Sequence, residues 1–118
     1  MATLLEMTIT HVPVLAGELV ELLDPAPGAV AVDCTVGGGG HARLIADRIG
    51  SRGTLIGIDR DPTAQERFEE VSREVGCTTR FIRATFADGL ALLLEEQVGA
   101  DCVYFDLHRG RSEIEVHA

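Results

Sequence analysis

Four short runs rich in apolar residues, separated by segments with helical spacing, limit the possible folds of this 118-residue chain more than any other feature. The runs are Ala29–Cys34, Thr54–Ile58, Arg80–Ala84 and Asp101–Phe105. Ala29–Cys34 has no polar alternation before Asp33, which is typical of a strand buried on both faces. Strands that alternate with helices imply parallel βαβ units with right-handed crossovers. The sequence therefore predicts an α/β fold with about four parallel strands.

Helices are expected between and around these strands. The predicted helices are Val14–Leu23, His41–Ile49, a segment that begins at Pro62, and Asp88–Gln97. In the third of these, Ala64, Phe68, Val71 and Val75 share one apolar face, and a proline is tolerated in a first helical turn. One domain with this order of elements is expected, without linkers or repeats.

A candidate ligand site lies at the predicted strand ends. Three strands end at or just before an aspartate, namely Asp33, Asp59 and Asp106. The glycine run Gly37–Gly40 follows the first strand and opens a helix, so backbone N–H groups can approach a ligand there and favour an anionic group. In open parallel sheets, ligands bind beyond the carboxyl ends of the strands. The pattern predicts a nucleotide-type cofactor site.

Two cofactors fit this outline. The glycine run satisfies G-x-G-x-x-G/A, and Asp59 follows about twenty residues later, as a dinucleotide site requires. However, Asp33 beside the loop would repel a doubly charged pyrophosphate. S-adenosylmethionine instead carries an ammonium, a sulfonium and one carboxylate, so that Asp33 and Asp106 would suit its cations and the helix start its carboxylate. The charge pattern favours the methyl donor.

Several of these residues have a second interpretation on local grounds. Asp33 is equally suited to bind loop amides or a ligand, and Asp59 by itself could merely cap a turn. His41 is compatible with a helix-start residue or a ligand contact. For Phe86 the local pattern favours core packing, because an aromatic ring in this position is more often buried. Asp106 could hold the loop after its strand or orient a nucleobase amine beside a sulfonium methyl.

The composition limits the classes of protein that this chain can represent. The formal net charge is −9 and the apolar content is 46%, which suits a packed core but lacks the basic footprint of a nucleic-acid binder. Cys34, Cys77 and Cys102 form no close pair, so buried structural thiols are expected rather than a metal site. No segment is apolar and long enough for a membrane span, and a cytoplasmic protein is expected.

Five motifs, found in order along the chain, resemble the bacterial 16S ribosomal RNA cytosine-N4 methyltransferase family. They are His11–Leu15 with Glu18, Val32–His41, Gly57–Pro62, Phe86–Asp88 and Phe105–Leu107. The glycine–histidine loop and the IDRDP segment are specific to this family. The resemblance implies a Rossmann-like fold that transfers a methyl group from S-adenosylmethionine to N4 of a cytidine in 16S ribosomal RNA of the small subunit.

The resemblance also implies roles for single residues. Carried over motif by motif, the cofactor-binding residues are Gly39, Gly40, His41, Asp59, Phe86 and Asp106. The first three would bind the methionine end, Asp59 would hold the ribose and Phe86 would lie against the adenine. Asp106 would be catalytic as well, beside the methyl group and the target amine. No metal is implied.

The resemblance ends abruptly after Leu107. The family continues with Gly-Val-Ser-Ser and then Gln-Leu-Asp, whereas this chain has His108–Ile114. Glu113 stands at the position of that glutamine, but the residues around it differ from those of the family. The role of the glutamine in the cofactor site is therefore not carried over to Glu113. Residues 1–107 are expected to form the N-terminal part of a methyltransferase domain, and residues 108–118 a divergent, unpacked tail left by a truncation. The alternatives are a non-catalytic cofactor-binding fragment and, more remotely, an NAD-dependent oxidoreductase.

Overall fold

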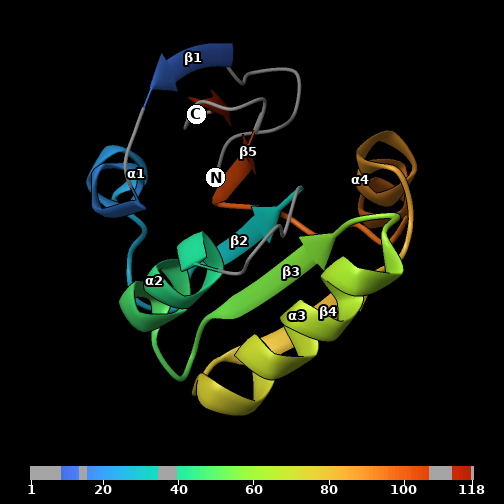
Figure 1. The fold of residues 1–118 in the computed structure, drawn as a ribbon, viewed down its shortest axis with the longest axis horizontal. Coiled ribbons are helices and arrows are strands. Elements are labelled where there is room, and N and C mark those ends of the chain that lie inside the picture. The colour runs from blue at the N-terminus through green and yellow to red at the C-terminus, as the bar shows by residue number, and fades with distance from the viewer. Residues whose placement is uncertain (1–8, 14–15, 35–39, 107–112, 118) are drawn as a thin grey trace.

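A computed structural model describes residues 9–13, 16–34, 40–106 and 113–117 of the chain (Figure 1). Its elements in chain order are β1 (Ile9–Pro13), α1 (Ala16–Leu23), β2 (Val30–Asp33), α2 (Gly40–Ile49), β3 (Thr54–Ile58), α3 (Pro62–Glu74), β4 (Thr78–Ile82), α4 (Phe86–Glu95), β5 (Cys102–Asp106) and β6 (Glu113–His117). Within these residues, no helix combines the length and the apolarity that a membrane span needs.

All the strands belong to one sheet, in the order β1-β6-β5-β2-β3-β4. Strands β5, β2, β3 and β4 are parallel to one another, while β6 pairs antiparallel with β5 and with β1. The predicted α/β fold with four parallel strands is confirmed. The chain runs from β2 outward to β3 and β4, then returns to place β5 on the other side of β2. Strand order therefore reverses at β2, the strand that precedes the glycine loop.

Two apolar clusters cover the two faces of this sheet. One cluster joins Ala31 of β2 and Tyr104 of β5 to buried residues of α1, α2 and α3. The other joins Val32 of β2 and Phe105 of β5 to Leu93 of α4. Successive residues of a strand point to opposite faces, so β2, β3 and β5 each contribute to both clusters. This double burial explains why these three strands read as nearly unbroken apolar runs.

The C-terminal segment differs from its prediction. Residues 108–118 were expected to be unpacked, but Glu113–His117 forms β6, hydrogen-bonded between β1 and β5. The period-two pattern of Glu-Ile-Glu-Val-His suits a strand, and a run of five residues was too short to separate from chance. Strand β1 was not predicted either. The division of the chain at residue 107 stays a prediction.

The limits of two further elements lie earlier than predicted. Helix α4 begins at Phe86 rather than at Asp88, because Thr85 is its N-cap and accepts a hydrogen bond from the Asp88 N–H at 3.2 Å. Strand β4 also begins two residues early, since the Thr78 N–H donates to the Gly53 carbonyl at 3.0 Å. The cap matters for the site, because it places the Phe86 ring at the start of α4.

A glycine lets α4 approach β3 closely. A Cβ atom at Gly89 would lie 2.6 Å from Cγ2 and 2.8 Å from Cδ1 of Ile58, the residue before Asp59. Alanine ordinarily stabilises a helix interior by about 1 kcal/mol relative to glycine. Here the overlap outweighs that gain, so Gly89→Ala is expected to lower the free energy of unfolding by about 1–2 kcal/mol in a urea titration. The control is Gly76→Ala, because no atom lies within 4 Å of a Cβ there. Equal stability of the two variants would contradict the close approach.

Candidate functional site

The three aspartates predicted to mark the strand ends lie at one edge of the sheet. Strand β2 ends at Asp33, β3 ends at Ile58 directly before Asp59, and β5 ends at Asp106. Because β2 is paired in parallel with both β3 and β5, the carboxyl ends of all three strands are neighbours. Helix α2 begins at Gly40, the next described residue after Cys34. The three aspartates therefore lie around the point where strand order reverses.

A pocket at this edge brings two of the predicted cofactor residues together. It has a volume of about 260 Å³ and is lined by Cys34, Asp59, Arg60, Ala84, Thr85 and Phe86. Asp59 follows β3 and Phe86 begins α4, so a carboxylate and an aromatic ring from separate elements share one hollow. A volume slightly below the usual 300–1,000 Å³ of ligand pockets suits part of a cofactor, such as its nucleoside.

Hydrogen bonds on both sides hold Asp59 in place. Its N–H donates to the Ile82 carbonyl and its own carbonyl accepts from the Ala84 N–H, both at 3.2 Å. Its side-chain Oδ1 accepts from the Asp61 N–H at 3.0 Å. Asp59 therefore does cap a turn, as one of the two interpretations of the sequence held, and it also lines the pocket. A carboxylate fixed in this way loses little conformational freedom when a ligand binds.

The turn at Asp59 leads into a second cap. Asp61 is the N-cap of α3 and accepts hydrogen bonds from the Thr63 hydroxyl at 2.7 Å and the Thr63 N–H at 2.9 Å. These two bonds lower the pKa of the exposed Asp61 below its ordinary value. The carboxylate is therefore charged at neutral pH, as a helix N-terminus favours.

Phe86 is both packed and half-exposed. Its ring meets the buried Phe105 edge-on, with ring centroids 5.0 Å apart and an interplanar angle of 81°. Nevertheless, 52% of Phe86 is accessible to solvent. Local sequence had favoured packing, and the structure combines that packing with a surface left open toward the pocket. A supported, accessible ring is suited to contact a flat base.

A buried polar pair lies at the carboxyl ends of β2 and β5, and the sequence did not predict this pairing. The Tyr104 hydroxyl of β5 donates a hydrogen bond to Oδ2 of Asp33 at 3.0 Å, and both residues are buried. Burial, followed by the charge of Asp33, raises the pKa of Tyr104 well above its ordinary value, so the phenol keeps its proton. Tyr104 is the one tyrosine of the chain, in an otherwise apolar run, and this was the signal that could have revealed the pair.

The cysteines agree with the expectation of buried structural thiols. Cys34, Cys77 and Cys102 are buried and unpaired. Burial raises the pKa of each thiol, to about 12 for Cys102. Cys34 lines the pocket, yet the charge of Asp33 raises its pKa further, so it stays a protonated thiol rather than a nucleophile. In the part of the chain that the structure describes, no three metal-ligating side chains form a cluster.

The remaining predicted residues are only partly described. Gly39 lies outside the described residues, and of Asp106 only the backbone position at the end of β5 is described. Gly40 and His41 form the start of α2. Their contacts with a cofactor stay a prediction.

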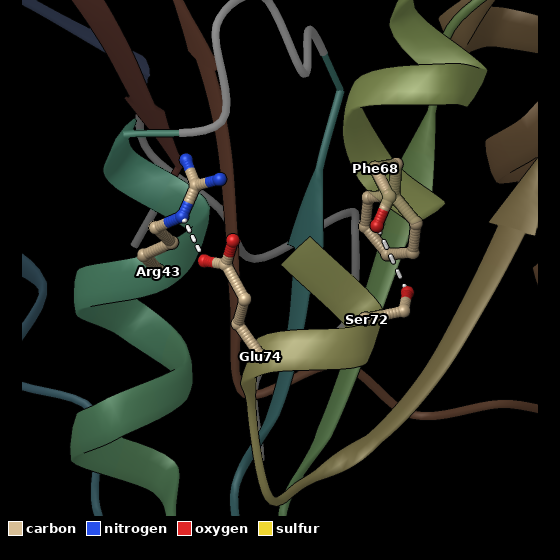
Figure 2. A network of polar contacts seen from close by, with 4 residues as sticks. All are labelled: Arg43, Phe68, Ser72 and Glu74. Atoms are coloured by element: carbon tan, nitrogen blue, oxygen red, sulfur yellow. Dashed lines mark hydrogen bonds and ion pairs between the residues drawn. The ribbon is translucent and has the colours of Figure 1, made fainter. Parts of the chain in front are cut away.

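An ion pair ties α2 to α3 (Figure 2). The Arg43 Nε donates to Glu74 Oε2 at 2.7 Å, which raises the pKa of Arg43 and lowers that of Glu74. On α3, the Ser72 hydroxyl donates to the Phe68 carbonyl at 2.9 Å. Both side chains are exposed, so this ion pair contributes little to the stability of the fold.

Solved structures share this fold at low sequence identity. The cyclopropane-fatty-acyl-phospholipid synthase-like protein of Lactobacillus casei matches with a TM-score of 0.53 and 19% identity, over 76% of this chain and 46% of that protein. A conserved hypothetical protein of Streptococcus pyogenes matches with a TM-score of 0.55 and 11% identity, over 87% and 94% of the two chains. Others carry the names methylase or methyltransferase. The architecture is the Rossmann-like fold of S-adenosylmethionine-dependent methyltransferases.

Sequence comparison identifies the family within this class. The profile of the MraW methylase family matches residues 8–115, and the chain belongs to that family. The ribosomal RNA small subunit methyltransferase H of Trichlorobacter lovleyi is 44% identical over 98 residues, and that of Geobacter sulfurreducens is 43% identical over 97. These alignments cover 82% of this chain but 31% and 30% of the relatives. The chain spans about a third of the length of the curated relatives that it matches.

Proposed function

We propose that this chain binds S-adenosylmethionine and forms the cofactor-binding part of a methyltransferase acting on N4 of a cytidine in 16S ribosomal RNA. The observation that carries the proposal is the pocket shared by Asp59 and Phe86, next to the reversal of strand order at β2. A carboxylate suits the ribose hydroxyls and an accessible ring suits the adenine. The family match supports the reaction class.

The charges of this edge support a methyl donor rather than a dinucleotide. Strands β2, β3 and β5 each end at or directly before an aspartate, and Asp33 is buried. A low-dielectric setting strengthens the interaction of such a charge with a ligand. A doubly charged pyrophosphate would be repelled there, whereas an ammonium and a sulfonium would be attracted. The proposed cofactor is therefore S-adenosylmethionine.

In the proposed mechanism the chain mainly positions its ligands. When bound, S-adenosylmethionine supplies an electrophilic methyl group. Gly39, Gly40 and His41 would hold its methionine end at the start of α2. Asp106 would accept hydrogen bonds from the cytidine amine, which orients its lone pair and offsets the positive charge that develops there. Positioning of this kind needs no general base with a shifted pKa.

The acidic balance of the chain, with a formal net charge of −9, offers little electrostatic attraction to the proposed RNA substrate. Arg43, Arg48 and Arg80 are already paired with acidic side chains. Arginines that are neutralised in this way offer little attraction to phosphates. We place the reaction in the cytoplasm, with the small ribosomal subunit as the partner.

Calorimetry and a transfer assay test the proposal. The chain is titrated with S-adenosylmethionine and, separately, with NAD, and is then incubated with small ribosomal subunits and radiolabelled methyl donor. Binding of S-adenosylmethionine with transfer of label is expected. Binding without transfer would reduce the role of the chain to cofactor binding. Binding of NAD in place of the methyl donor would overturn the proposal.

Phe86→Ala tests the contact with adenine. Stacking of a base on an aromatic ring contributes about 1–3 kcal/mol, so the dissociation constant for S-adenosylmethionine is expected to rise about tenfold by calorimetry. Leu94→Ala is the matched control, because Leu94 is an equally exposed apolar residue near the other end of α4. Equal effects of the two substitutions would contradict a specific role for the ring.

A further inference from the structure

Asp33 and Tyr104 face each other across neighbouring strands. They are register partners in the parallel pairing of β2 with β5, although 71 residues separate them in the chain. Their side chains are joined by the 3.0 Å hydrogen bond from the Tyr104 hydroxyl to Asp33 Oδ2. The backbone just after Asp33 is joined to Tyr104 as well, because the Cys34 N–H donates a hydrogen bond to the Tyr104 carbonyl at 2.9 Å. Tyr104 thus contacts both the carboxylate and the backbone that leads into the glycine loop.

The burial of this pair makes the hydrogen bond energetically important. Asp33 is 1% exposed and Tyr104 is 0% exposed. A carboxylate removed from water is destabilised by several kcal/mol unless hydrogen bonds compensate for its lost hydration. A phenol that keeps its proton is a fixed donor, and a hydrogen bond to a charged acceptor is about twice as strong as a neutral one. The hydrogen bond therefore restricts the orientation of the Asp33 carboxylate.

The pair lies on the side of the sheet covered by α2. Tyr104 packs in the apolar cluster that contains Ala42 and Ile45 of this helix. Cys34, the next residue after Asp33, belongs to the opposite cluster and lines the pocket with Phe86. The Asp33 charge is thus on the α2 side of the strand end, and the nucleoside pocket is on the other side. The start of α2 is where the methionine end of the cofactor is proposed to bind.

We infer that Tyr104 is a positioning residue for cofactor binding. Its hydroxyl fixes the Asp33 carboxylate so that the negative charge favours the ammonium of the methionine end. This inference rests on the proposed binding of S-adenosylmethionine. It adds a residue that acts through Asp33 and does not touch the nucleoside.

Tyr104→Phe tests the inference, because it removes a single oxygen atom. The dissociation constant for S-adenosylmethionine is expected to rise about tenfold, the scale of one hydrogen bond to a charged group. Affinity for 5′-methylthioadenosine, which has the adenine and ribose but lacks the amino acid, is expected to stay unchanged. A variant that merely loosened the fold would lose both ligands alike. Phe68→Leu, a buried core change on α3 away from Asp33, controls for stability.

A double-mutant cycle with Asp33→Asn shows whether Tyr104 acts through the carboxylate. Asp33→Asn alone is expected to weaken binding of S-adenosylmethionine selectively, and it carries the test if Tyr104→Phe does not fold. In the Asp33→Asn background, Tyr104→Phe should change the affinity less than about twofold, since coupled residues are not additive. Equal affinity of Tyr104→Phe and the wild-type chain for S-adenosylmethionine would overturn this inference alone. Failure of the wild-type chain to bind S-adenosylmethionine would overturn the proposed function together with it.

Discussion

Asp59→Ala is expected to raise the dissociation constant for S-adenosylmethionine about a hundredfold, because two ribose hydroxyls lose a charged acceptor worth about 1.5–3 kcal/mol per hydrogen bond. The carboxylate lines the pocket, and its backbone is held by Ile82 and Ala84 of the neighbouring chain segment. A preformed acceptor contributes more to affinity than a mobile one, since little ordering is needed on binding. Calorimetric titration of the variant and the wild-type chain measures the change.

The structural role of Asp59 requires a separate control. Its Oδ1 accepts from the Asp61 N–H, and Asp61 in turn caps α3. Asp61→Ala removes that cap and is expected to lower the free energy of unfolding without a matching loss of affinity. Asp59→Asn keeps an oxygen for the turn and removes the charge, so its affinity should lie between those of Asp59→Ala and the wild-type chain. An Asp61→Ala variant that binds as weakly as Asp59→Ala would show that the turn, rather than the carboxylate, is responsible.

Much of the parallel sheet could be predicted from the sequence because its signals are local. Strand β3 has the limits that were predicted, Thr54–Ile58, since an apolar run between turn residues needs no knowledge of its neighbours. The meeting of Asp33, Asp59 and Asp106 at one edge also followed, because parallel strands place their carboxyl ends together. For these strands, the local apolar pattern and the topology of a parallel sheet predict the same arrangement.

The features that were missed depend on pairing between distant segments. The bond from Tyr104 to Asp33 requires β5 to lie beside β2, and alternation of strands and helices does not specify that order. Strand β6 was missed for a similar reason, because its pairing with β1 and β5 supplies hydrogen bonds that five residues cannot indicate by themselves. Local sequence alone assigned the Phe86 ring to the core, and it was the family resemblance that placed this ring in one cofactor site with Asp59.

Asp106→Asn is expected to lower the rate of methyl transfer about a hundredfold, the effect of removing one charged group that stabilises a developing charge. The residue ends β5 beside the end of β2, at the edge where Asp33 and Asp59 also lie. Asparagine keeps the shape of the side chain but loses the charge that offsets the positive amine in the transition state. Because the same carboxylate is also proposed to attract the cofactor sulfonium, the affinity for S-adenosylmethionine should fall as well, but by less than the rate, about tenfold or less. Transfer of radiolabel to small ribosomal subunits and calorimetry measure the two quantities.

The matched control for Asp106 lies at the opposite end of the same strand. Asp101 precedes β5, and its carboxylate accepts a hydrogen bond from the Val30 N–H at 2.8 Å. Asp101→Asn removes the same charge but keeps an acceptor for that bond, so both transfer and cofactor affinity should stay close to those of the wild-type chain. If Asp101→Asn slowed transfer as much as Asp106→Asn, net charge rather than position would explain the loss. If Asp106→Asn lost affinity and rate in equal proportion, the carboxylate would act by holding the cofactor, and the proposed alignment of the amine would be wrong.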